Sequence, residues 1–194
     1  MNTRVSEAVI NARSGTLLES AAWVSPSPSW WGDARLLLVA LWLGAALFSL
    51  VVAQVAFAVL PTRELAGALV GRTLAVLNMS GCAISLLLLA TWWLGRSRAE
   101  SATRRARLVE AVALVGLALA TGVNQWVVTA RLQALRAAMP GPVEALAKDD
   151  PLRVQFGALH GISVLVLGVG IIAAFVAFFA AAQRNRGAHM SGVR

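Results

Sequence analysis

Charged residues and cysteine are both scarce in this chain. Charged residues make up 13% of its 194 positions and the mean hydropathy is +0.72, whereas soluble proteins carry about 25% charged residues. The single cysteine, Cys82, excludes an intrachain disulfide and says nothing about the redox compartment. This composition excludes an ordinary soluble domain and favours one compact membrane domain.

Residues that usually carry chemistry are equally few. The sequence contains no glycine-rich phosphate loop, no Ser/His/Asp set and no paired intramembrane carboxylates. One intramembrane histidine, His160, cannot ligate a haem from both sides, and Cys82 is expected at a different depth, so no zinc site can be assembled. We therefore expect no enzyme activity and no cofactor, with His160 as the one candidate metal ligand.

The basic residues point to a membrane rather than to nucleic acid. The net charge is +8, but the arginines lie in short stretches beside apolar runs, as in the cytoplasmic loops of membrane proteins. No basic surface is left that could follow a phosphate backbone, so we expect no nucleic-acid partner. Only one of the 17 basic residues is a lysine, Lys148, which indicates a coding bias rather than bidentate anion recognition.

Four long apolar runs are present. Leu36 to Leu60 is uncharged, and about 20 helical residues suffice to cross a hydrocarbon core of about 30 Å. The sequence predicts an all-α membrane protein, an antiparallel four-helix transmembrane bundle with spans at 36–60, 70–94, 108–128 and 156–182. We expect Asp33 to cap the first helix, Asp149 or Asp150 to cap the last, and the third to continue as a surface helix.

The same runs divide the chain into three parts. Residues 1–35 are predicted to be a cytoplasmic segment with a short interfacial helix or disorder, 36–183 the transmembrane domain, and 184–194 a disordered cytoplasmic tail. Four crossings place eleven basic residues on the side of the termini and six on the other. This excess predicts cytoplasmic termini, in a multi-pass protein of the bacterial inner membrane.

Polar side chains within the spans are predicted to share the outer half of the bilayer. We interpret them as a candidate outer-leaflet polar pocket, although hydrogen bonding between helices alone would also explain most of them. Glu110 lies in the inner half, and we expect it to pair with Arg105 or Arg107 at the surface. The pocket candidates are Gln54, Arg72, Asn78, Asn124, Gln125, His160 and Ser163.

Small residues recur at helical spacing and are predicted to pack against neighbouring helices. They fall on one face of the second span at Gly67, Gly71 and Gly81, and on one face of the fourth at Gly157, Gly161 and Gly168, and Gly44 of the first span is predicted to pack in the same way. Such faces could also join copies of the chain, so we expect a homo-oligomer or another membrane protein as partner, besides the lipid bilayer.

Two stretches of sequence carry a family resemblance. LWLGAALF, VAQVAF, LP and AGALVGR within Leu41 to Arg72, together with FGALHGIS at Phe156 to Ser163, resemble the transmembrane protein 205-like proteins. The resemblance implies four helices and no established reaction, and Gln54 replaces a proline expected there, so the first helix should lack a kink. It gives weight, without roles, to Gly44, Phe48, Ala66, Gly67, Gly71, His160 and Ser163.

Two functions follow from these observations. The first is a helical-bundle membrane protein that acts by interaction or assembly. The second is a binder or carrier of a small solute or metal ion in the outer-leaflet pocket. A fainter similarity to the copper-resistance D-type membrane domains, which have few helices and outer-face histidines, implies copper as the metal, but this chain offers one such histidine, and its nearest methionines are Met79 and Met139. A hydrated outer cavity would favour the second function, and a tight bundle with hydrogen-bonded polar residues the first.

Overall fold

The computed structural model describes the backbone of residues 30–94 and 104–191 and the side chains of 32–94 and 104–184. The predicted segment 1–35 lies outside the described residues up to residue 29. From Gly32 on, the chain forms one compact unit. Its described part is helical and contains no strand.

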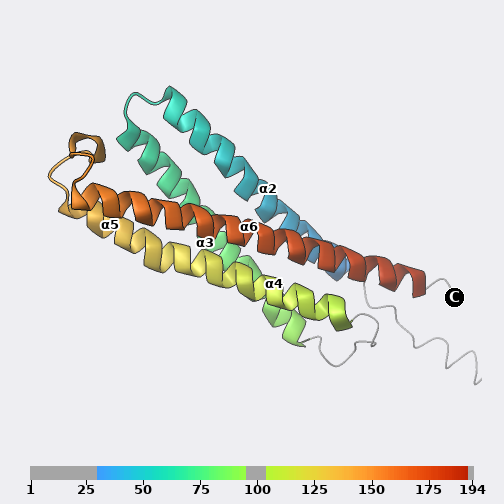
Figure 1. The fold of residues 1–194 in the computed structure, drawn as a ribbon. Helices are drawn as coiled ribbons and strands as arrows, with labels where there is room; N and C mark the ends of the chain where they lie inside the picture. The colour runs from blue at the N-terminus through green and yellow to red at the C-terminus, as the bar shows by residue number, and fades with distance from the viewer. Residues whose placement is uncertain (1–29, 95–103, 192–194) are drawn as a thin grey trace, which may run out of the picture. The chain divides into compact units, whose positions relative to one another are not determined.

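Four helical rods are long and apolar enough to cross a bilayer, at Gly32–Val59, Arg63–Leu94, Arg104–Ala138 and Pro151–Arg184. This confirms the all-α four-helix fold (Figure 1). The helices themselves are α2 (Trp30–Val59), α3 (Arg63–Leu94), α4 (Arg104–Val123), α5 (Thr129–Ala138) and α6 (Pro151–Ser191). The protein is therefore a multi-pass membrane protein.

The helix ends differ in part from those predicted. Because α2 already begins at Trp30, Asp33 lies in its first turn rather than at its N-cap. The backbone N–H of Leu152 donates to Asp150 Oδ1 over 2.8 Å, which makes Asp150 the cap of α6, as expected. At its other end α6 continues to Ser191, because no proline interrupts residues 184–191. The predicted disordered tail is thus wrong for these residues.

The third rod changes its winding in the middle. Residues Asn124–Val128 form a π-helical turn, and the hydroxyl of Thr129 donates to the carbonyl oxygen of Asn124 over 2.8 Å. The π-helical turn does not interrupt the helix, so α4 and α5 continue in one direction beside α6 (Figure 1). The predicted surface helix is therefore part of the third crossing, at its C-terminal end.

The core of the bundle is built from leucine and alanine around one tryptophan. Leu114 and Leu117 of α4 are fully buried, and α4 packs against both α3 and α6. Alanines line the contact of α4 with α6, where the Cβ of Ala120 lies near Gly170 and that of Ala173 near Gly116. Alanine and glycine are both small enough to let two helices approach closely, so α4 and α6 pack through alanines that face Gly116 and Gly170.

Trp42 of α2 fills the space between α2 and α3. Its indole Nε1 donates to the carbonyl oxygen of Leu77 over 2.9 Å, and the ring lies over Gly81. A Cβ at Gly81 would lie 2.5 Å from Trp42 Nε1 and 2.9 Å from Thr121 Cγ2. The absence of a side chain at this position therefore allows α2, α3 and α4 to meet.

The other predicted packing glycines behave differently. A Cβ added at most of them would meet no heavy atom within 4 Å, because the helix contacts are made by the alanine-rich faces. At Gly67 it would meet only the guanidinium of Arg136, at 2.9 Å from Nη2. Within this chain, the predicted helix packing is not found at Gly44, Gly71, Gly157, Gly161 and Gly168.

Candidate functional site

The most deeply buried charge in the described chain is the carboxylate of Glu110. Glu110 lies near the start of α4 and exposes only 2% of its side chain. An ionised carboxylate in such a position needs positive partners and hydrogen bonds, because its desolvation is otherwise costly. Two arginines from other helices provide them.

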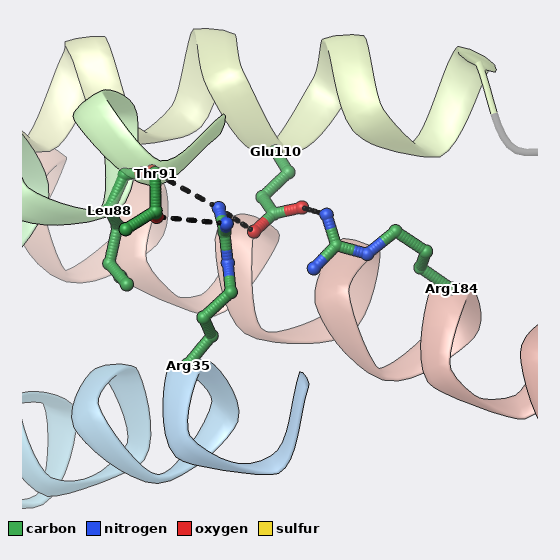
Figure 2. Close-up of polar contacts among 5 residues, drawn as sticks. All are labelled: Arg35, Leu88, Thr91, Glu110 and Arg184. Atoms are coloured by element: carbon green, nitrogen blue, oxygen red, sulfur yellow. Dashed lines mark hydrogen bonds and ion pairs between the residues drawn. The ribbon is translucent and has the colours of Figure 1, made fainter. Parts of the chain in front are cut away.

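Each carboxylate oxygen of Glu110 binds a different arginine. Arg35 Nη2 of α2 donates to Oε1 over 3.0 Å, and Arg184 Nη1 of α6 donates to Oε2 over 2.7 Å. The arginine side chains are themselves 11% and 19% exposed. Figure 2 shows the two guanidinium groups reaching the carboxylate from opposite sides. We call Arg35, Glu110 and Arg184 the ion cluster.

Helix α3 also contacts the ion cluster, through hydrogen bonds from Arg35. Arg35 Nη1 donates to Thr91 Oγ1 over 3.0 Å, and Arg35 Nη2 donates to the carbonyl oxygen of Leu88 over 3.2 Å (Figure 2). Thr91 Oγ1 in turn donates to Leu88 O over 2.9 Å. The network therefore ties α2, α3, α4 and α6 together at one end of the bundle.

The ion cluster carries an unbalanced charge. Two guanidinium groups and one carboxylate leave a formal charge of +1, and the Nε of Arg35 is buried without a hydrogen-bond partner. Arg107 lies close by, with its guanidinium carbon 5.9 Å from the ring centroid of Trp92. This end of the bundle is thus connected by ion pairs and hydrogen bonds around a cluster with a net positive charge.

The sequence analysis placed Glu110 with the wrong partners. Arg105 and Arg107 are on the same helix as Glu110, whereas its actual partners come from α2 and α6. Arg35 immediately precedes the first apolar run, and Arg184 follows the last. The sequence could have indicated this pairing, because Arg35, Glu110 and Arg184 all lie at span ends that are expected at the same membrane face.

Part of the predicted outer-leaflet pocket is present as a buried polar contact. Asn124 is 1% exposed, and its Oδ1 accepts a hydrogen bond from Ser163 Oγ over 2.8 Å. Asn78 of α3 is 2% exposed, and α3 packs against the π-helical turn that contains Asn124. The adjacent Gln125 is half-buried, with Oε1 buried and without a hydrogen-bond partner.

The remaining pocket candidates lie on the outside of the bundle. Gln54, Arg72 and His160 are exposed on α2, α3 and α6 respectively. The ring of His160 stacks on Phe156 at a centroid distance of 6.5 Å, and Arg136 lies 5.2 Å from the centre of that Phe156 ring. Of the seven residues, Asn124 and Ser163 are thus hydrogen-bonded to each other, whereas Gln54, Arg72 and His160 are exposed, because a shared depth does not place residues on the same face of their helices.

Most hydroxyl groups in the spans bond within their own helix. Ser85 Oγ donates to Gly81 O over 2.7 Å, and Thr121 Oγ1 donates to Leu117 O over 2.7 Å. This satisfies them locally. Among the described residues, no group of three or more His, Cys, Asp or Glu side chains could hold a metal ion.

Comparison with known proteins gives one result. A family model described as "Domain of unknown function (DUF4149)" matches residues 37–140, more than half of the chain. The match covers α2 from Leu37 to the end of α5 and includes Glu110, whereas Arg35 and Arg184 lie outside it. No curated protein and no solved structure matches. With four membrane-spanning helices and this match, the chain belongs to the DUF4149 family, whose function is unknown.

Proposed function

We propose that this protein is an assembly component of the membrane, which binds a second membrane protein or another copy of itself through the outer half of its bundle. The observation that carries the proposal is the outward exposure of Gln54, Arg72 and His160 within the spans. Polar and ionisable groups on a face that lipid would cover are costly and commonly mark a functional contact. A protein partner would supply hydrogen bonds to these groups, which acyl chains cannot provide.

The surroundings of these residues also suit a helix contact. Gly71 precedes Arg72, while Gly157 and Gly161 flank His160, and each of these glycines is exposed with open space around it. Small residues next to polar ones let a partner helix approach closely and bond. The glycines that make no contact inside this chain therefore support a contact outside it.

A carrier of a small solute or metal ion is supported less well. Such a carrier would need its polar residues to line a common cavity, but Asn124 is bonded to Ser163 and His160 lies on the outer surface. We therefore place assembly ahead of transport, copper transport included.

Orientation and identity complete the proposal. We infer a bacterial inner-membrane protein with both termini in the cytoplasm, because four crossings would place eleven basic residues of the sequence on the side of the termini and six on the other. We also infer a relationship to the transmembrane protein 205-like proteins and the absence of enzyme activity. The charge distribution supports the orientation, and the quoted sequence resemblance supports the relationship. The absence of enzyme activity is supported by the lack of a Ser/His/Asp set and of paired intramembrane carboxylates in the sequence.

The test compares the size of the assembly before and after each polar group is removed. We expect the wild-type chain, extracted in mild detergent, to migrate on native gels as a complex larger than the 20.4 kDa chain. His160→Leu and Arg72→Leu should release the chain from that complex. Leu165→Ala, at a 71% exposed apolar position of α6, is the matched control and should leave the complex intact. A wild-type chain that is monomeric, or leucine variants that keep the full complex size, would contradict the proposal.

A further inference from the structure

A shallow groove runs between α4 and α6 at the ion-cluster end of the bundle. Its volume is about 440 Å³. The walls are apolar and include Val109 of α4 with Ile172, Phe175 and Phe179 of α6. Among the described residues, the polar members of its lining are Arg105 and Gln183.

The groove is about as long as the hydrocarbon part of one leaflet is thick. From Ile172 to Gln183, α6 rises by about 16 Å, at ~1.5 Å per residue. One leaflet contributes about 15 Å of hydrocarbon. An extended acyl chain lying in this groove would therefore run from the middle of the membrane to the level of Arg105.

The charge at the end of the groove favours an anionic headgroup. Among the described residues of this end, Arg35, Arg104, Arg105, Arg107 and Arg184 are basic, whereas Asp33 and Glu110 are acidic. Both oxygens of Glu110 are bound to arginines of the ion cluster, so this carboxylate does not neutralise Arg105. Arg105 itself is exposed at the mouth of the groove.

We propose that this groove binds an anionic phospholipid, with one acyl chain along Ile172, Phe175 and Phe179 and the phosphate at Arg105. The apolar walls match the chain, and the positive mouth matches the headgroup. Basic sites between helices at the cytoplasmic face are a recognised mode of anionic lipid binding. The groove lies at the opposite end of the bundle from His160, so it is independent of the assembly surface proposed above.

Native mass spectrometry of the full-length chain in detergent tests the charge requirement. Phosphatidylglycerol and phosphatidylcholine with identical acyl chains are added separately. We expect phosphatidylglycerol to bind several-fold more tightly, and Arg105→Gln to weaken its binding about fivefold, the usual contribution of one arginine near a lipid surface. Arg63→Gln, an exposed arginine at the other end of the bundle, is the control and should leave binding unchanged.

A second pair of variants tests the groove itself. Val176 lines the groove and is 41% exposed, so Val176→Trp should fill it without disturbing the core and should weaken binding of both lipids. Val169→Trp, at a 57% exposed position of α6 outside the groove, should not. Equal binding of the two lipids, or no effect of Val176→Trp, overturns the proposal. So does a dimer that forms in wild type and is lost in Val176→Trp, because a second copy would then occupy the groove.

Discussion

The contact of Trp42 with Gly81 shows how one missing side chain determines the approach of three helices. The indole occupies the space where a Cβ at Gly81 would lie, and it uses its N–H to bond Leu77 O. A helical glycine normally costs about 1 kcal/mol relative to alanine. Here the glycine is required because alanine would overlap both Trp42 and Thr121.

Gly81→Ala should therefore destabilise the protein despite the higher helix propensity of alanine. We expect a loss of about 1–3 kcal/mol, the usual cost of overpacking a core. Gly44→Ala is the matched control, because a Cβ there meets nothing within 4 Å, and it should be neutral or stabilising by up to about 1 kcal/mol. Thermal unfolding of the detergent-solubilised variants measures the difference. Equal midpoints for the two variants would argue against the close contact.

At the scale of the helices, the ion cluster connects helices that are not joined to each other by the short turns of the chain. The turns join α2 to α3 and α5 to α6, whereas Glu110 joins α4 to α2 and α6. Helices in lipid lack the hydrophobic driving force that assembles soluble bundles. A buried ion network at one end thus specifies which helices are neighbours there.

Removing the central carboxylate should separate these helices at their inner ends. Glu110→Gln leaves two arginines without their counter-charge, and breaking a buried pair in this way costs about 3–5 kcal/mol. Replacing all three members together, as Arg35→Met, Glu110→Leu and Arg184→Met, should restore most of the loss, because no uncompensated charge remains. Thermal unfolding again provides the measurement. If the triple variant is less stable than Glu110→Gln, the cluster stabilises the fold by more than charge compensation.

The sequence predicted the helices well and their faces poorly. The apolar run lengths were sufficient to predict four crossings, and Pro61 and Gly95 follow α2 and α3 closely. Depth along a helix also follows from counting residues, and Glu110 does lie near the start of α4, at the same end of the bundle as Arg35 and Arg184. The direction in which each face of a helix points cannot be predicted by counting residues. Each span is apolar on all of its faces, so no single face stands out as the buried one.

The outer polar residues illustrate the same limit. Asn124 and Ser163 were grouped by depth and do meet, but His160, three residues before Ser163, lies on the outer surface. The glycines singled out in the sequence were mostly not those of the helix contacts, since α4 and α6 meet where Gly116 faces Ala173 and Gly170 faces Ala120. Arg35 and Arg184 were counted only as loop charges, since a sequence does not show which charges at one depth share a partner.

For the molecule as a whole, the distribution of arginine sets the expected orientation in the membrane. In a Cys82→Ser background, Thr62→Cys and Glu144→Cys lie at exposed positions of the turns opposite the ion cluster. A membrane-impermeant maleimide should label both in intact cells. Leu94→Cys, 76% exposed at the ion-cluster end, should be labelled only after permeabilisation. The reverse pattern would place the termini outside.

The ion cluster also imposes an order on biosynthesis. Arg35 is made early, yet its carboxylate partner follows 75 residues later, and Arg184 emerges another 74 residues after Glu110. At about 5–20 residues per second, a ribosome takes several seconds to synthesise each of these intervals. Until α6 enters the bilayer, Glu110 has at most one of its two arginines, so this end of the bundle can close only after Arg184 has been synthesised.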